Sequence, residues 1–202
     1  GFSEDLVKVL PIGSNSKIVS SMPEKEKKRT LVFLSRLSKS KGVEDAIKCV
    51  SLLKDEYKDL TSWIIGRGDP SFREVLDGLV KKLNVGDRVK FFNYVTEEKK
   101  QELLTRAHIL VMPSAKEGWG LTIHEAGARS TPSIVYNVPG LSEVVINGVN
   151  GLVCYENSPE ELAKNVKRLF SDSTLYKKLQ EGAILERKKH NWDKTADIFL
   201  EF

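Results

Sequence analysis

Two glutamates stand eight positions apart in the segment "KEGWGLTIHEAGA", on either side of a Gly-Trp-Gly turn. Glu117 directly precedes the first glycine, and Glu125 falls in the helix-like stretch that follows. A carboxylate accepts hydrogen bonds, so it suits the hydroxyl groups of a ribose or a hexose rather than a phosphate. The plainer alternative is a solvated Glu117, with Glu125 paired to Arg129 one helical turn later.

Basic side chains and glycines follow two earlier apolar runs. Arg36 and Lys41 come shortly after "LVFLS", and a Gly-Arg-Gly triplet at 66–68 follows "SWII". Bare backbone amides, basic side chains and the positive end of a helix dipole are groups that bind phosphate oxygens. Each signal is weak alone, since a single Arg or Lys is most often a solvated surface charge. Together they predict an anion site if the fold brings them to one edge.

Other motifs for phosphate or metal are not met. The triplet at 66–68 lacks the third glycine of a dinucleotide fingerprint and follows the second strand, which disfavours a nicotinamide cofactor. The sequence contains no Walker A motif and no Asp-x-Asp pair. His108, His124 and His190 share no metal-ligand spacing, so no metal site is expected.

The candidate residues need a scaffold that holds them at one edge. Six short apolar runs lack strict alternation, as is typical of strands buried on both faces. Amphipathic segments at 43–53, 72–83 and 97–107 lie between them and indicate helices. This alternation predicts an α/β fold with a doubly wound, parallel, six-stranded Rossmann-like sheet, which binds ligands beyond the carboxyl ends of its strands. The predicted strands span residues 31–35, 62–65, 89–92, 109–112, 133–136 and 152–155.

A helix start is encoded towards the C-terminal end. In "NSPEEL", Ser158 is predicted to be the N-cap, Pro159 the first helical residue and Glu161 the partner that closes a capping box. From there to the end we expect helix in two or three pieces, with a break near residues 190–193.

The first residues are organised differently. They hold the strand-like run "VKVLPIGSN", and the polar stretch after it indicates a loop. We expect residues 1–20 to be the remnant of an interdomain strand or linker, and residues 21–202 to form one domain cut from a longer protein.

The composition is that of an ordinary globular protein, with 40% hydrophobic and 30% charged residues. The net charge is only +4 and the lysine pairs are scattered, so a nucleic-acid surface is not expected, although anionic ligands or lipids would be attracted modestly. Cys49 and Cys154 are predicted to be small buried side chains, which fits a reducing cytoplasm, where we expect the protein to be. No run is long enough to span a membrane, and the N-terminal residues are too polar for a signal peptide.

The order of these segments resembles the donor-binding domain of retaining glycosyltransferases of the GT-B fold, in the large family 4 group. The matching segments are "RLSKSKG", "IIGRGD" and the long stretch from "MPSAKEGWG" to "GVNGLV". The resemblance extends from about Val9 to the "NWDK" segment near the C-terminal end. The family's signature is a pair of glutamates with seven residues between them, which Glu117 and Glu125 match.

The resemblance implies a role for each matching residue. Arg36 and Lys41 would hold the diphosphate of a nucleotide-sugar donor, of the UDP or GDP type. Glu117 would contact the transferred sugar, which makes it a candidate catalytic residue together with the two basic residues. Glu125 would bind the ribose. The other implied donor-binding residues are Gly66, Gly68, Gly118, Trp119, Gly120, Leu121 and Thr122.

The implied reaction transfers the sugar to an acceptor hydroxyl with retention of configuration. It would need no metal or other cofactor, because basic side chains and backbone amides stabilise the departing diphosphate. Some positions depart from the family pattern and leave the identity of the donor open: Ser35, Asn93, Ser130 and Ser133. Others match the family's downstream loop, where a structural role is expected: Gly140, Glu143, Gly148 and Gly151.

Two other functions stay open from the sequence. The same domain is compatible with a non-catalytic nucleotide-sugar-binding module that acts with a partner subunit. A nicotinamide-dependent dehydrogenase domain is disfavoured by the incomplete glycine fingerprint. Because the acceptor site of such transferases belongs to an N-terminal domain that we expect to be missing, this chain alone should bind donor weakly and transfer nothing. The resemblance allows a lipid-linked or growing glycan as acceptor, and peripheral association of the full-length protein with the inner membrane face.

Overall fold

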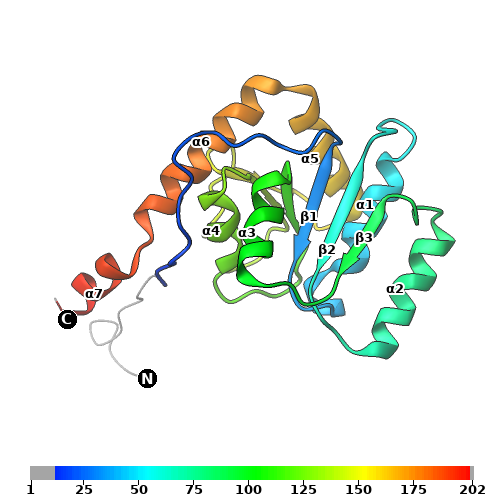
Figure 1. The fold of residues 1–202 in the computed structure, drawn as a ribbon, viewed down its shortest axis with the longest axis horizontal. Coiled ribbons are helices and arrows are strands. Elements are labelled where there is room, and N and C mark those ends of the chain that lie inside the picture. Colours follow the sequence, from blue (N-terminus) through cyan, green and yellow to red (C-terminus); the bar gives the residue numbers. More distant parts are fainter. Residues whose placement is uncertain (1–11, 201–202) are drawn as a thin grey trace.

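Six parallel strands form one sheet in the computed structural model, which describes residues 12–200 of the chain (Figure 1). Each strand lies within two residues of its predicted bounds: β1 (Thr30–Leu34), β2 (Thr61–Ile65), β3 (Val89–Phe92), β4 (Ile109–Met112), β5 (Ser133–Val135) and β6 (Gly151–Val153). The strand order is β3-β2-β1-β4-β5-β6. The chain therefore winds outward from β1 to β3 and then crosses back to build the other half, which confirms the doubly wound α/β prediction.

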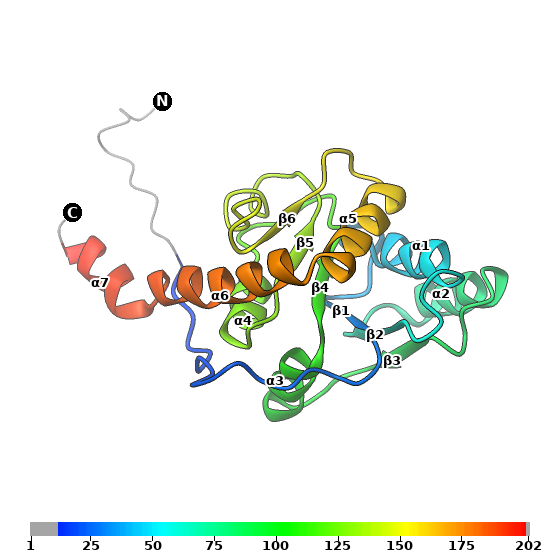
Figure 2. The same ribbon diagram turned by 90° about the horizontal axis from the view of Figure 1, so that it is seen from above.

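Helices cover both faces of the sheet (Figures 1 and 2). They are the short 3-10 helix η2 (Lys39–Lys41), α1 (Val43–Leu53), α2 (Pro70–Lys82), α3 (Glu97–Arg106), α4 (Leu121–Ala128), α5 (Pro159–Ser171), α6 (Ser173–Lys189) and α7 (Trp192–Leu200). Phe33 packs in a core with α1, α2 and α5, whereas its neighbour Val32 packs on the other face with α3 and α4. This follows from the alternation of side chains along a strand. Cys49 and Cys154 are free and buried, as predicted.

The start of α5 agrees with the sequence only in part. Ser158 accepts a hydrogen bond from the Glu161 amide at 3.2 Å, and Pro159 is the first helical residue. The predicted capping box is wrong, however, because the Ser158 amide donates to the carbonyl oxygen of Glu156. The Glu161 carboxylate instead pairs with Lys164 at 3.0 Å, since a lysine three residues ahead competes for it.

The C-terminal region is helical in three pieces, as predicted. The break at residues 190–191 separates α6 from α7. Between residues 12 and 200 there is no helix with both the length and the hydropathy needed to cross a lipid bilayer.

The segment before β1 contacts the domain closely. Residues 1–11 of the predicted linker strand lie outside the described residues, and residues 12–20 form no strand. Their backbone groups bond elsewhere: the Val19 amide donates to the last residue of α4 at 2.9 Å, and Arg187 donates to two carbonyl oxygens of this segment. The domain boundary at residue 20 stays a prediction.

Candidate functional site

The candidate site lies where the strand order reverses, between β1 and β4. The loops after these two strands lead to opposite halves of the sheet and leave a crevice at its carboxyl edge. Two contacts join the loops: the Ala115 amide donates to the Ser40 carbonyl at 2.9 Å, and Gly42 packs against Pro113. A Cβ at Gly42, whose φ is +70°, would lie 1.8 Å from the Pro113 oxygen, so this position requires glycine.

A cleft of about 560 Å³, here called the first cleft, opens at this edge. It is lined by Ile12, Ser35, Lys41 and the segment Glu117–Thr122. Lys41 Nζ lies 2.8 Å from Glu117 Oε2, and both side chains are largely shielded, with exposed fractions of 16% and 17%. The fold thus brings a predicted phosphate ligand and a predicted sugar ligand into direct contact.

The start of α4 forms one wall of the first cleft. Gly120 precedes the helix in the left-handed conformation, with a φ of +65°. The amides of Leu121 and Thr122 belong to the first helical turn, whose N–H groups have no partner within the helix. The helix dipole adds partial positive charge at this end. An anion in the first cleft would therefore meet bare amides and the Lys41 ammonium together.

Gly140 supports the turn that carries Glu117. Its φ is +80°, and a Cβ there would lie 2.5 Å from the Glu117 carbonyl oxygen and 2.7 Å from that of Gly118. The Gly118 amide donates to Glu117 Oε1 at 3.1 Å, which orients the carboxylate. This close approach gives Gly140 the structural role expected of it.

A second cleft of about 400 Å³ adjoins the first, and Leu121 lines both. The second cleft is lined by Glu125, Glu97, Trp192 and the segment 13–16. The two glutamates of the signature therefore open onto neighbouring clefts on either side of Leu121. This arrangement suits one extended ligand better than two separate ones.

Glu125 is bound by a lysine from another helix. Lys100 Nζ, on α3, lies 2.6 Å from Glu125 Oε1 and 2.8 Å from Glu97 Oε2. Burial lowers the pKa of Lys100, but its hydrogen bonds to the two carboxylates more than offset this, so the pKa stands above its usual value. The plainer alternative, a pair between Glu125 and Arg129, is not formed, because Arg129 Nε donates to Gln101 at 2.5 Å instead.

Three other predicted residues lie outside both clefts. Arg36 is exposed and lines neither cleft. A Cβ at Gly66, whose φ is +147°, would lie 1.8 Å from the Ser35 carbonyl oxygen, and one at Gly68 would lie 2.3 Å from that of Leu37. These glycines let the loop after β1 pass close to the loop after β2. A role for them in donor binding stays a prediction.

Comparison with known proteins identifies the family. Residues 14–186 match the family model for glycosyl transferases group 1. The chain belongs to the group 1 glycosyltransferases. It is 32% identical over 181 residues to the D-inositol 3-phosphate glycosyltransferase of Streptomyces bingchenggensis, an alignment that covers 84% of this chain. The chain spans only 40% of the length of that relative.

Solved structures place this glycosyltransferase domain in the GT-B fold. Sucrose-phosphate synthase from Thermosynechococcus elongatus superposes with a TM-score of 0.85 at 24% identity, over 96% of this chain and 51% of the other. Anabaena HepE in complex with UDP superposes with a TM-score of 0.79 at 21% identity, over 86% of this chain and 48% of the other. These similarities show that the sheet and its helices match those of GT-B glycosyltransferases.

Aromatic residues of the glycosyltransferase domain pack beneath the glycine turn. The ring centroids of Trp119 and His190 are 6.4 Å apart, and those of His190 and His124 are 4.6 Å apart. Burial, followed by the charges of His190 and Arg187, lowers the pKa of His124 to about 4, so it is neutral at pH 7. Among residues 12–200 no group of three or more His, Cys, Asp or Glu side chains is placed to hold a metal.

Two features of the candidate site do not follow from the sequence alone. Lys100 stands 25 residues before its partner Glu125, and only the packing of α3 against α4 reveals the pair. The segment 13–16 belongs to the predicted linker, yet it forms a wall of the second cleft. Neither feature follows a local spacing rule, so an alignment of relatives would be the signal that identifies them.

Proposed function

We propose that this chain is the donor-binding domain of a retaining GT-B glycosyltransferase of family 4. The full enzyme would take a sugar from a nucleotide-diphosphate sugar and transfer it to an acceptor hydroxyl. The Lys41–Glu117 pair, inside a cleft that opens onto the first turn of α4, carries this proposal. It sets a phosphate-binding cation beside a hydroxyl-binding carboxylate, at the edge where parallel sheets bind ligands.

The donor's diphosphate would lie over the start of α4. There the amides of Leu121 and Thr122 and the Lys41 ammonium all favour negative charge. A diphosphate would draw Lys41 away from Glu117 and leave that carboxylate for the hydroxyls of the transferred sugar. Arg36, which is exposed on the loop that leads to Lys41, would reach the outer phosphate oxygens.

The ribose would lie in the second cleft. Lys100 holds Oε1 of Glu125, and no described residue bonds to Oε2, which would accept hydrogen bonds from the ribose hydroxyls. A uridine nucleotide is our first choice, because HepE, which has the same fold, was solved with UDP. The two adjoining clefts would then hold the two ends of one donor molecule.

The chemical step would depend on electrostatic stabilisation of the departing diphosphate. Lys41, Arg36 and the amides of α4 supply the positive charge that a metal supplies in other transferases, so we propose a metal-independent reaction. The acceptor, which we propose to be a lipid-linked or growing glycan, would bind to an N-terminal domain outside this chain. The full enzyme would then work in the cytoplasm, at the inner face of the membrane.

Calorimetric titration of the chain tests this function. UDP, GDP, ADP and their glucose conjugates are titrated without added metal, with NADH as the negative control. We expect saturable binding of one nucleoside diphosphate, weakened about tenfold or more in Lys41→Ala, the loss typical of a charge-assisted hydrogen bond. Lys39→Ala, in the same short helix but outside the clefts, is the matched control. An unchanged affinity in Lys41→Ala would overturn the assignment of the first cleft.

A further inference from the structure

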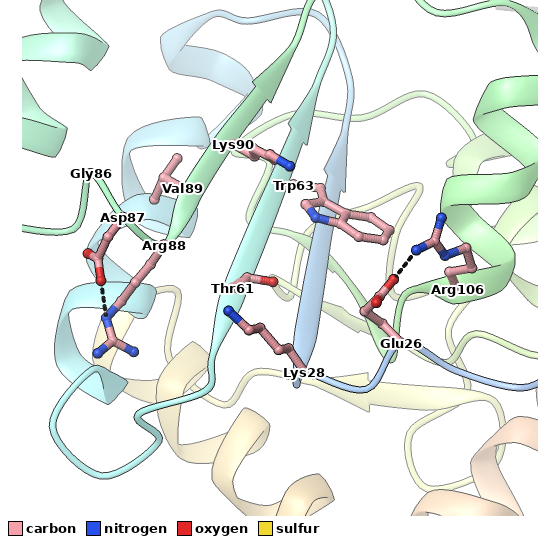
Figure 3. Close-up of a pocket in the computed structure, with 10 residues that line it drawn as sticks. All are labelled: Glu26, Lys28, Thr61, Trp63, Gly86, Asp87, Arg88, Val89, Lys90 and Arg106. Carbon is pink, nitrogen blue, oxygen red and sulfur yellow. Dashed lines mark hydrogen bonds and ion pairs between the residues drawn. The ribbon is translucent and has the colours of Figure 1, made fainter.

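Another cavity lies at the opposite, amino-terminal edge of the sheet (Figure 3). Its volume is about 370 Å³, and its walls are the first residues of β2 and β3, the segment before β1 and the end of α3. The two clefts of the candidate site lie beyond the carboxyl ends of the strands. A strand of five residues such as β2 separates the two edges by about 15 Å. The cavity is therefore a distinct feature of the domain.

The cavity exists because one part of the sheet is uncovered. On the face that carries α3 and α4, α3 packs with Trp63 and Ile65 of β2, but β3 at the sheet edge is left partly uncovered (Figures 1 and 2). Trp63 and Lys90 are register partners on these strands, so their side chains stand together on that face. Trp63 forms the apolar wall, with an exposed fraction of 8%. Figure 3 shows Lys28, Thr61, Trp63 and Lys90 along the same side of the two strands.

Two of the four basic residues that line this cavity already have partners within the domain. Arg106 Nη2 lies 2.5 Å from Glu26 Oε2. Arg88 donates to the Tyr57 carbonyl at 2.9 Å and points away from the others (Figure 3). Lys28 and Lys90 are exposed, and no side chain of residues 12–200 pairs with either ammonium. The cavity thus offers two positive charges beside an indole ring.

We propose that this cavity binds a soluble phosphate monoester that carries a sugar ring. A phosphate monoester has a charge close to −2 at pH 7, which matches the two unpaired lysines. The ring would lie against the small part of the Trp63 indole that faces the cavity, beside the Arg106 guanidinium, which lies 5.9 Å from the centroid of that ring. The volume lies within the range of small-ligand pockets. Such a ligand would bind independently of the donor, so this inference does not require the proposed function to hold.

The test uses Trp63 as an internal reporter. In a Trp119→Phe/Trp192→Phe background, Trp63 is the remaining tryptophan, and its emission is followed during titration with glucose 6-phosphate, glucose and inorganic phosphate. We expect a saturable change with glucose 6-phosphate and none with glucose. Calorimetry with the unmodified chain should give the same affinity, and saturating UDP should not alter it.

Charge variants make the test specific. Lys28→Ala/Lys90→Ala should weaken glucose 6-phosphate binding about tenfold or more, as expected for lost charge-assisted hydrogen bonds. Lys27→Ala/Lys81→Ala removes two exposed lysines outside the cavity and should leave the affinity unchanged. Equal weakening in both pairs, no saturable binding, or competition by UDP would overturn the proposal. Binding to phosphatidic acid vesicles, but not to glucose 6-phosphate, would overturn the soluble ligand in favour of a lipid headgroup.

Discussion

Each glutamate of the signature is paired with a lysine, but the two pairs are built differently. Glu117 belongs to a loop and Lys41 is the last residue of the short 3-10 helix η2, and both line the first cleft. Glu125 and Lys100 belong to the helices α4 and α3, and Lys100 lines neither cleft. A second carboxylate, that of Glu97, also binds Lys100 at 2.8 Å.

This difference separates a pair that a ligand can open from a pair that it cannot. A diphosphate would exchange one anionic partner of Lys41 for another, because its oxygens replace the Glu117 carboxylate, so the ammonium never loses a charged partner. Lys100 has two carboxylate partners, Glu97 on its own helix α3 and Glu125 on α4. Because Lys100 does not line the second cleft, a ligand there would not reach it. We infer that Glu117 changes partners during donor binding, whereas Glu125 is held ready.

Gly140→Ala should disrupt the Lys41–Glu117 pair and leave the Lys100–Glu125 pair intact. A Cβ there would meet two backbone oxygens of the Glu117 turn at 2.5 and 2.7 Å, so the turn must move. We expect a loss of about 1 to 3 kcal/mol in the free energy of unfolding, measured by urea denaturation. Affinity for UDP should fall about a hundredfold, because the amides and Lys41 lose their common geometry.

The matched control for this substitution is Gly78→Ala. Gly78 lies in α2 with open space around its Cα, so an added methyl group should stabilise the helix by about 0.5 to 1 kcal/mol. An unchanged UDP affinity in Gly140→Ala, at normal stability, would show that the position of the Glu117 turn does not control diphosphate binding.

Lys100→Met should affect the second pair and only the ribose end of the donor. Without the ammonium, Glu125 and Glu97 repel each other and Glu125 loses its fixed orientation. UDP affinity should fall about tenfold, while that of 2′-deoxy-UDP changes much less. Lys100→Arg should restore the preference for ribose, and Lys99→Met, which removes a lysine paired with Glu102, should have no effect. Equal losses for both nucleotides would show that Lys100 acts through stability alone.

The sequence predicted the sheet well because the relevant signals are local. Each strand is a short, largely apolar run, and the glycine turn before α4 has the left-handed residue that its position requires. The same locality limits what sequence spacing says about the partner of Glu125. Arg129 stands four residues ahead, where the helix rule expects it, but the packing of α3 on α4 brings Lys100 closer.

The glycines after β2 show a second limit of sequence reasoning. A Gly-Arg-Gly triplet beyond a strand predicts a close approach of backbone to something, and phosphate was the expected partner. At Gly66 and Gly68 the close neighbour is the backbone of the loop after β1. Because glycine serves both purposes with the same residue type, only the fold distinguishes them.

Glu117→Gln should change UDP affinity the least, but whether the affinity rises or falls distinguishes two roles of Glu117. If Glu117 and a diphosphate compete for Lys41, removing the negative charge should strengthen UDP binding about threefold, since UDP then no longer has to displace a carboxylate from the ammonium. The gain should be smaller for a UDP-sugar, which loses an acceptor for its hydroxyls. Glu143→Gln, an exposed carboxylate on the neighbouring loop, should change neither affinity. If UDP bound more weakly to Glu117→Gln by calorimetry, Glu117 would be holding Lys41 in place for the phosphate, and both lysine–glutamate pairs would be fixed supports.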